Sequence, residues 1–594
     1  MTSPPVVLGV RLRSDARLDE PWEEDQAIAT GFHSPDVLIP GVLYQGNPAG
    51  LAALESGWHG LVPQWSGAEG DRLLVEEHRL PAPFVAMEWD PWPNEPDRGR
   101  KGIALHSLPS PVPFAGRGDL WWSIGAQADE AGTDLLLMSG PVSLNGQDGV
   151  VKSGQGTATP YPDTFLRVPP GGTVEKSFWL QAYDVQEPGS GFQHALREAI
   201  ALHGPFPSAG MPVVEDIVRA KLRFAKSRWR GDSPQPGFAM YPHDRDLYVM
   251  GWAGQSEAPG YALQVLADRL GEPELRTVAH RTLDALAQSP YDAGGFRLAL
   301  NGRTGEWSRQ DPVSQGQAMS TFARGIRVGR EQGADTAKWE DFLRQACEVY
   351  AGRFLARAWD ESDRPRSTAE AFLINPLCLG AALFDEPRYL EAATLAGEHY
   401  WQRHRSMEEP YWGGTLDAQC EDKEGAWAAF EAFLALHHAT DDPKWLDAAT
   451  HAAEVCLTYT YLWDVDLPPG RLRDHDLKTR GWTSVSVQNM HLDVFGVVYT
   501  PELWRLGQLT NRPELIELAE LMFRSCGQMI DADGSQGEQL QQTRFAQGGD
   551  LSDPDTFRGG YVEGWTVFWI TAHFLTAAAQ FEEMGVLEQL WRKP

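Results

Sequence analysis

The connections between the helix-forming segments of this chain alternate between short and long, and this alternation constrains its fold more than any other feature. From about residue 213 onwards, apolar residues recur at helical spacing, which predicts twelve helices at 213–229, 254–270, 272–288, 314–331, 336–356, 367–384, 387–405, 423–439, 443–459, 491–509, 512–529 and 562–582. Joints after even-numbered helices are short and polar, whereas joints after odd-numbered helices are long and rich in Trp, Gly, Asp, Arg and His. Six such pairs predict a double ring of helices, an (α/α)6 toroid over residues 213–594, with its long loops gathered at the N-termini of the inner helices.

Residues 1–190 follow a different pattern. Short apolar segments such as FVAMEW, LWWSIGAQ and KSFWLQAY recur between clusters of Gly, Pro, Asp and Asn, which predicts an N-terminal antiparallel β-sandwich domain. The helical segment GFQHALREAIALHG then precedes the breaker PFPSAGMP, so residues 191–212 are predicted to form a helical linker. The expected fold class is therefore multi-domain β + α, a β-sandwich followed by a helical toroid.

The charge of the chain limits its partners. Its 594 residues carry a formal net charge of -31, so we expect neither nucleic acid nor an anionic membrane surface as a general partner. The N-terminal segment has no charged region followed by an apolar one, which indicates no secretion signal and favours a cytoplasmic protein. The sequence does not indicate an oligomeric state.

Several kinds of chemistry lack their motifs. The five cysteines are scattered and no C-x-x-C occurs, which argues against a disulfide framework and a cysteine-rich zinc site. The chain also lacks a Walker loop, G-x-G-x-x-G, H-E-x-x-H and G-x-S-x-G. We therefore expect no metal and no cofactor.

The chain contains 23 Trp, an excess that points mildly to carbohydrate, because an indole offers a flat apolar face beside a polar N–H. Ordinary helix packing is the alternative explanation for any single Trp. The long loops combine these Trp residues with carboxylates and amides, and a ring would bring the loops together. The predicted substrate-binding residues are Trp252, Gln255, Glu257, Asp311, Trp412, Arg480, Trp482, Gln488, Asn489, Tyr561 and Trp565.

The densest acidic cluster is Glu421, Asp422 and Glu424 at the start of the helix at 423–439. Cleavage of a glycosidic bond needs two carboxyl groups, one of them held protonated, and crowding of carboxylates raises some of their pKa values. Helical spacing would place Glu421 and Glu424 on similar sides, with Lys423 turned away or acting as a charge partner. Helix capping and the helix dipole also favour acidic residues at such positions, so a structural role is the alternative.

Two further candidate catalytic groups begin other inner helices. His491 and Asp493 could transfer protons, beside the amides of Gln488 and Asn489, although an N-cap turn with a buried His would have the same sequence. Glu563, at the start of the last helix, could be the opposing carboxylate.

Basic residues gather in the fifth long loop, which includes Arg480. Arginine binds carboxylates in a bidentate manner, so a uronic acid is a possible substrate, while pairing of this loop with its own Asp474 and Asp476 is the alternative.

The layout resembles carbohydrate-active enzymes that place a β-sandwich ahead of an (α/α)6 toroid. The resemblance covers nearly the whole chain but is mainly architectural. Its segments are PGVLYQGNP (40–48), RLPAPFVAM (79–87), GWAGQ (251–255), CEDKEG (420–425) and GWTSVSVQNMHLD (481–493). The group includes glucuronidases, unsaturated glucuronyl hydrolases, other glycosidases and some polysaccharide lyases, so the resemblance implies sugar chemistry at the face of the toroid.

The leading prediction is a glycoside hydrolase that uses carboxylate acid–base catalysis at the end of a small carbohydrate substrate, with a uronic acid at the cleaved end as a secondary prediction. A lyase acting on a uronic acid is the alternative enzyme, with Tyr561 or His491 as base and Arg480 neutralising the carboxylate. A non-catalytic carbohydrate-binding protein is the third possibility, because it would need stacking Trp residues but no carboxylate cluster.

Overall fold

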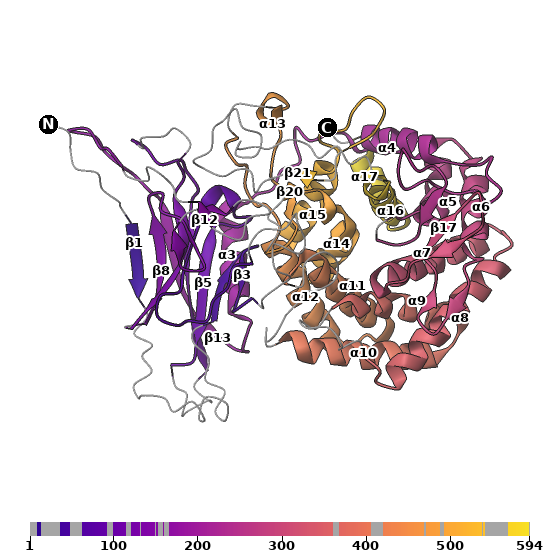
Figure 1. Cartoon of the computed structure of the whole chain (residues 1–594), viewed down its shortest axis with the longest axis horizontal. Coiled ribbons are helices and arrows are strands. Elements are labelled where there is room, and N and C mark those ends of the chain that lie inside the picture. The colour runs from indigo at the N-terminus through magenta and orange to yellow at the C-terminus, as the bar shows by residue number, and fades with distance from the viewer. Residues whose placement is uncertain are drawn as a thin grey trace.

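A computed structural model describes residues 9–13, 36–47, 62–91, 99–114, 120–130, 132–148, 150–151, 158–159, 166–252, 254–359, 368–405, 420–467, 471–487, 492–536, 539–540 and 568–592. Strands fill one side of the molecule and a ring of helices fills the other (Figure 1). The predicted class, antiparallel sheet followed by helices, is confirmed.

Two antiparallel sheets make up the N-terminal part. The first has the order β1 (Gly9–Arg13), β8 (Gly132–Met138), β7 (Ser123–Asp129), β4 (Arg72–Glu76), β9 (Ser143–Leu144) and β10 (Gln147–Asp148). The second has the order β13 (Phe178–Val185), β6 (Arg100–Ser107), β5 (Phe84–Trp89), β2 (Asp36–Ile39) and β3 (Leu43–Tyr44). Alternate side chains of both sheets enter one shared core, which includes Val37, Val85 and Leu105 from the second sheet and Leu73, Ile124 and Leu135 from the first.

The helix α3 (Gly191–His203), predicted as part of a linker, is a packed element between the two parts. Its apolar residues Phe192, Leu196 and Ile200 recur at helical spacing and are buried. It contacts β5, β6 and β13 on one side and the helix α12 on the other. It therefore joins the second sheet to the ring instead of spanning a gap between them.

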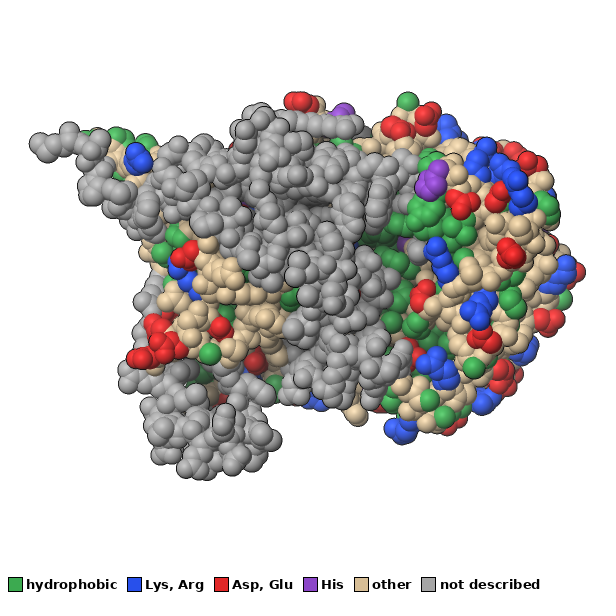
Figure 2. Space-filling model, viewed as in Figure 1, with side chains coloured by type: hydrophobic (Ala, Val, Ile, Leu, Met, Phe, Trp, Pro, Cys, Tyr) green, Lys and Arg blue, Asp and Glu red, His purple; other side chains and the backbone are tan. Residues whose placement is uncertain are grey.

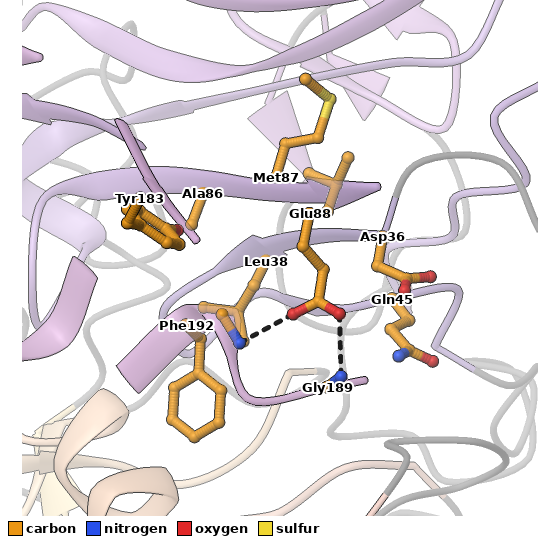
Figure 3. Close-up of a pocket in the computed structure, with 11 residues that line it drawn as sticks. Asp36, Leu38, Gln45, Ala86, Met87, Glu88, Tyr183, Gly189 and Phe192 are labelled. Atoms are coloured by element: carbon orange, nitrogen blue, oxygen red, sulfur yellow. Dashed lines mark hydrogen bonds between the residues drawn. The ribbon is translucent and has the colours of Figure 1, made fainter. Parts of the chain in front are cut away.

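The carboxylate of Glu88 on β5 fixes the start of α3. It accepts the backbone N–H groups of Gly189 (2.8 Å) and Gly191 (2.7 Å), as Figure 3 shows, and it also pairs with Arg100 (3.0 Å). A carboxylate at this position stabilises the N-terminus of a helix. A small pocket lies around Glu88, with an empty volume of about 290 Å³. Its carboxylate is already bound to the start of α3 and to Arg100.

The twelve predicted helices of the ring are present, and the ring closes. The inner helices are α5 (Ala258–Leu270), α7 (Pro312–Glu331), α9 (Ile374–Phe384), α11 (Lys423–Thr440), α14 (Thr500–Leu509) and α16 (Trp569–Glu583). Each packs against the next in this order, and α16 packs against α5. The outer helices are α4 (Val214–Arg228), α6 (Leu275–Leu286), α8 (Ala337–Leu355), α10 (Pro387–Arg405), α12 (Pro443–Thr458) and α15 (Pro513–Ser525).

Two inner helices begin later than the sequence pattern indicates. The 3-10 segments η3 (Ala369–Leu373) and η4 (Phe495–Tyr499) precede α9 and α14. The prediction of a helix over 491–509 is wrong at its start, because Leu492–Asp493 form the strand β20, which pairs with β19 (Thr483–Ser484) and with β21 (Gln539–Leu540). This small sheet ties the fifth long loop to the sixth. The first six positions of the helix predicted at 562–582 lie outside the described residues.

A second small sheet ties the first long loop to the second. It consists of β14 (Leu247–Val249), β17 (Ala299–Asn301) and β18 (Trp307–Ser308). The long loops at the inner-helix starts are therefore held by backbone hydrogen bonds to each other as well as by their helices.

The sheets and the ring meet along a polar and aromatic contact. The backbone N–H of Leu462 donates to the carbonyl of Pro81 (3.0 Å), and the indole N–H of Trp463 donates to the carbonyl of Leu80 (3.0 Å). Tyr44 stacks on Tyr459 with ring centroids 5.2 Å apart. The segments 40–48 and 79–87 thus include residues that contact the ring.

Glu454 on α12 organises a second part of this contact. This buried carboxylate accepts from Gln193 (2.7 Å) and Arg197 (2.7 Å) on α3, and from Arg512 (2.5 Å) before α15. One carboxylate therefore links the bridging helix to two outer helices of the ring.

We expect Glu454→Ala to lower the free energy of unfolding by about 2 kcal/mol, because charge-assisted hydrogen bonds are lost while the half-exposed Arg197 can regain water. Guanidinium unfolding followed by tryptophan fluorescence measures the change. Glu454→Gln keeps the shape and part of the acceptor capacity, so it should lie between the two proteins. An unchanged midpoint for Glu454→Ala would contradict this role.

Candidate functional site

Contacts between helices that are not neighbours in the ring identify the side chains that fill its lumen. Trp427 of α11 lies 6.3 Å from His573 of α16 between ring centroids, although α14 separates these helices. Arg324 of α7 pairs with Glu431 of α11 at 3.3 Å, although α9 separates them. Only side chains that point toward the ring axis can meet in this way.

The lumen-facing stripe of α11 is Glu424, Trp427 and Glu431, at positions i, i+3 and i+7. Its members lie at successive depths, with Glu424 next to the long loops. The stripe of α16 places Trp569 and His573 four residues apart in the same manner. The upper lumen is therefore built by the first turns of the inner helices.

Five aromatic side chains form one cluster in the upper lumen, which we call the aromatic floor: Trp252, Trp427, Phe495, Trp569 and His573. Trp252 stacks on Phe495 at 4.8 Å and lies 6.2 Å from Trp427 and 5.7 Å from His573. Trp252 is partly exposed, whereas the other four are buried. Burial lowers the pKa of His573 to about 3, so this imidazole is neutral at physiological pH.

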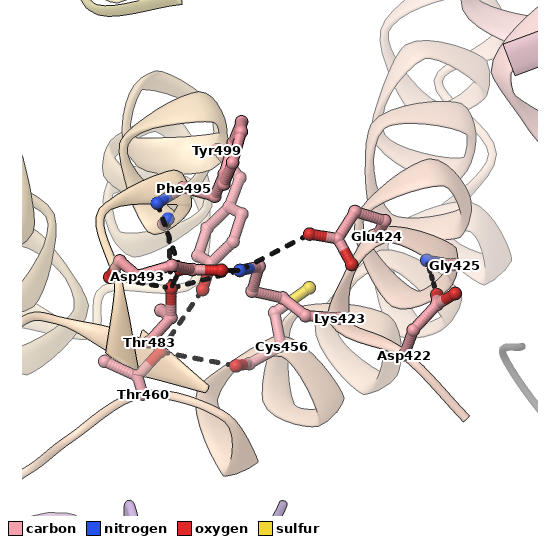
Figure 4. Close-up of polar contacts among 11 residues, drawn as sticks. Asp422, Lys423, Glu424, Gly425, Cys456, Thr460, Thr483, Asp493, Phe495 and Tyr499 are labelled. Atoms are coloured by element: carbon pink, nitrogen blue, oxygen red, sulfur yellow. Dashed lines mark hydrogen bonds and ion pairs between the residues drawn. The ribbon is translucent and has the colours of Figure 1, made fainter. Parts of the chain in front are cut away.

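An ion pair lies at the edge of this floor (Figure 4). The ammonium of Lys423 donates to both carboxylate oxygens of Asp493, at 2.8 and 2.6 Å, and to the hydroxyl of Thr483 at 3.1 Å. It also lies 5.5 Å from the ring centroid of Phe495. Burial alone would lower the pKa of Lys423, but Asp493 and Glu424 outweigh this effect and raise it, so the lysine is charged.

Asp493 is fully engaged by the fold. In addition to Lys423, it accepts the hydroxyl of Thr483 and the backbone N–H of Phe495, the latter at 3.0 Å. The predicted catalytic residue Asp493 is thus placed where it holds Lys423 and the start of η4.

Glu424 lies 3.4 Å from the ammonium of Lys423 and is 3% exposed. Burial raises the pKa of Glu424 to about 8; Lys423 opposes the rise, and the negative charges of Asp422 and Asp493 add to it. The carboxyl therefore carries its proton at neutral pH. A protonated carboxyl in the lumen can donate that proton to a leaving oxygen.

The other two members of the acidic cluster lie just before the first residue of α11. Asp422 is the N-cap of α11 and accepts the N–H of Gly425 at 2.6 Å. Glu421 precedes the helix, and its carbonyl accepts the N–H of Val487. The helical-spacing argument for Glu421 therefore fails, and the expectation that Lys423 turns away is wrong; its alternative, Lys423 as a charge partner, is confirmed.

The start of α5 brings a second perturbed carboxyl. Glu257 is fully buried, and one of its oxygens accepts the backbone N–H of Gly251 at 3.0 Å, next to Trp252. Burial raises the pKa of Glu257 to about 7, while the Gly251 N–H opposes the rise. Gln255, with φ of 51°, donates to Gln317 of α7 at 2.7 Å. The helices α5 and α11 stand opposite each other in the ring of six, so Glu257 and Glu424 lie at the starts of opposite inner helices.

A polar layer lies deeper in the lumen. Asn375 of α9 donates to Glu431 at 2.8 Å, and Arg324 pairs with the same carboxyl. Tyr261 of α5 donates to Glu583 of α16, which also pairs with Arg327. These cross-ring contacts bridge the lumen below the aromatic floor.

Other predicted residues lie away from the lumen. Asp311 is exposed and caps α7 by accepting the N–H of Ser314 at 2.7 Å. Arg480 pairs with Asp464 at 2.9 Å, whereas Lys478 of the same loop pairs with Asp476 at 2.7 Å, as the alternative predicted. Trp482 is buried beside Tyr461, whose N–H donates to its carbonyl at 2.8 Å.

Seven predicted residues lie outside the described part of the chain: Trp412, Gln488, Asn489, His491, Tyr561, Glu563 and Trp565. Sequence reasoning, for its part, missed Trp427, Phe495, Trp569, His573 and Gln317. Trp427, Trp569 and His573 lie in apolar stretches whose pattern equals that of a core-facing helix, and only ring closure shows that this core face is the lumen.

Figure 2 shows hydrophobic side chains gathered on the ring half of the visible face, beside the undescribed residues, with acidic and basic groups mixed over the rest. Among the described residues, no helix has the length and apolarity of a membrane span, and no three His, Cys, Asp or Glu side chains are grouped as a metal site.

No protein-family model and no curated protein sequence matches the chain. Solved structures similar to it include a D-mannose isomerase (11% identity, 63% of this chain and 97% of that one, TM-score 0.42). A family 76 glycoside hydrolase from a bovine Bacteroides thetaiotaomicron strain shows 12% identity over 82% of this chain and 96% of its own, with a TM-score of 0.41. An unsaturated glucuronyl hydrolase specific for heparin shows 11% identity over 63% of this chain and 97% of its own, with a TM-score of 0.39.

We expect Lys423→Met to lower the free energy of unfolding by about 3–5 kcal/mol, because it leaves the buried Asp493 carboxylate without its counter-charge. Denaturant unfolding measures this loss. The double variant Lys423→Met/Asp493→Asn carries no uncompensated charge and should recover part of the stability. If the double variant lost more free energy of unfolding than the two single variants lose together, the pairing would be contradicted.

Proposed function

We propose that this chain is a glycoside hydrolase in which Glu424 is the general acid. The observation that carries the proposal is a lumen-facing carboxyl that burial keeps protonated at neutral pH, beside Lys423 and at the edge of an aromatic floor. A glycosidic oxygen is a poor leaving group until it is protonated, so a positioned acid with a pKa near the working pH is what the reaction needs.

Glu257 is the proposed second carboxyl. It lies at the start of the inner helix opposite that of Glu424, an arrangement in which two carboxyls can flank a scissile bond. One of its oxygens is fixed by Gly251, and the other has no hydrogen-bond partner in the part of the chain that the structure describes. The ionised form of this free oxygen would attack the sugar or activate a water molecule.

The proposal assigns the chemistry to the toroid, residues 213–594, with residues 1–190 as a β-sandwich domain and 191–212 as the connecting segment. Action at a chain end is supported by the layer around Arg324 and Glu431, which bridges the lumen below the aromatic floor. A long polymer could not thread through such a ring, whereas a terminal sugar could enter from the loop side.

A lyase is supported less well. Beta-elimination from a uronic acid needs a cation to neutralise the substrate carboxylate, and Arg480, proposed from sequence for this role, is already paired with Asp464. A panel of aryl glycosides and uronic-acid oligosaccharides separates the possibilities: release of phenol without an unsaturated product supports the hydrolase, and an unsaturated product supports the lyase. Sugar binding without turnover of any compound would leave a binding protein.

We expect Glu424→Gln to lower kcat/KM by about 10²–10⁴-fold on the best aryl glycoside, because the amide keeps the shape but cannot donate the proton. Asp311→Asn is the matched control, since it changes a carboxyl at another inner-helix start and asparagine retains the cap. A loss of less than about tenfold for Glu424→Gln, with an intact fold, would refute the assignment.

The pKa values give a pH profile. Glu424 must be protonated, so kcat/KM should fall as the pH rises through about 8. Glu257 must be ionised, so kcat/KM should fall as the pH drops through about 7. The wild-type profile is expected to be a narrow bell, and Glu257→Gln should abolish most activity at every pH. A flat profile across this range would show that other groups carry the protons.

A further inference from the structure

Five buried polar atoms in the upper lumen have no hydrogen-bond partner among the described residues. They come from three inner helices and the N-cap of a fourth, and none of their residues is more than 9% exposed. The atoms are Glu257 Oε1, Gln317 Nε2, Trp427 Nε1, Trp569 Nε1 and His573 Nε2.

These atoms belong to residues of the aromatic floor or to residues that contact the loop of Trp252. Trp427, Trp569 and His573 belong to the aromatic floor itself. Glu257 holds the backbone beside Trp252, and Gln317 receives the hydrogen bond of Gln255 from the same loop. A buried polar group without a partner destabilises a protein, so five in this group of residues indicate a ligand that supplies the partners.

The set is mixed in its hydrogen-bonding character. The two indole groups and the Gln317 amide donate, the free Glu257 oxygen accepts when ionised, and a neutral imidazole offers either a donor or an acceptor at Nε2. A hydroxyl group both donates and accepts, and a ring of hydroxyls around an apolar C–H face would satisfy the polar atoms while its face lies on Trp252.

The charges around the site disfavour an anionic sugar. Of the described cations beside the lumen, Lys423 is held by Asp493 and Arg324 by Glu431. Arg480 is held by Asp464. A sugar carboxylate in the upper lumen would meet the carboxyls of Glu257 and Glu424 with no described cation left to compensate it.

We infer that the upper lumen binds an uncharged hexopyranose unit, with a hydroxymethyl group where a uronic acid would carry its carboxylate. This inference rests on the proposed function for the location of the site, and it replaces the uronic acid suggested by the basic loop. The aromatic floor takes the C–H face, and Glu257, Gln317, Trp427, Trp569 and His573 take the hydroxyls.

The test uses the full-length Glu424→Gln protein, so that binding is measured without turnover. Its intrinsic tryptophan fluorescence is titrated with matched pairs of methyl hexopyranosides of gluco, manno and galacto configuration, α and β, that differ only in carrying a hydroxymethyl or a carboxylate at C5. We expect at least one hydroxymethyl compound to bind about tenfold or more tightly than its uronate partner. Equal or tighter binding of the uronate, or binding of neither, would overturn the inference.

Two tryptophan variants locate the site. Trp427→Phe should weaken binding of the preferred sugar about tenfold, whereas Trp504→Phe removes another buried indole N–H without a partner, outside the aromatic floor, and should leave binding unchanged. Equal effects of the two would overturn the assignment of the site. Neutral-sugar binding without hydrolysis by the wild type would refute the proposed function alone, and hydrolysis restricted to uronides would refute this inference alone.

Discussion

The geometry of the candidate site depends on one buried ion pair. Lys423 begins an inner helix, and Asp493 ends the strand that precedes η4, so their contact fixes two walls of the lumen relative to each other. Two charges removed from water require each other, because either alone would be an uncompensated charge in an apolar interior. The same pair sets the electrostatics of Glu424: its positive member lies close enough to restrain the pKa rise, and its negative member adds to it. Burial raises the pKa of Glu424, and the ion pair that positions the two walls adjusts the size of this rise.

The helical part of the fold could be predicted because each helix carries its signal locally. Apolar spacing and Pro at helix starts, as in α12 and α15, are visible without knowledge of the partners. The start at 491 could not be predicted in this way: the strand containing Asp493 exists because Thr483 and Leu540 lie beside it, and these contacts are not local. Tertiary pairing there overrides a helical pattern.

The site could be predicted only in part, for a related reason. Carboxylates at helix starts stand out in a sequence, which is why Glu257 and Glu424 were among the predicted residues. Trp427 and His573 look like ordinary core residues, because a side chain that faces a ring axis follows the same periodicity as one that faces a neighbouring helix. For Lys423 the sequence left two orientations open, because a lysine at a helix start is usually solvated. The buried carboxylate of Asp493 explains why this lysine is buried as a charge partner.

The closure of the ring by α16 on α5 has a consequence for how the protein comes into being. Tyr261 and Glu583, which meet in this closure, are 322 positions apart in the chain. During synthesis the helices emerge in order, and domains form as their sequences become available. The lumen cannot be enclosed before α16 has been synthesised, so the aromatic floor and the buried carboxyls of the nascent chain lack one wall until then. The walls of the candidate site are therefore complete only after α16 has been added to the ring.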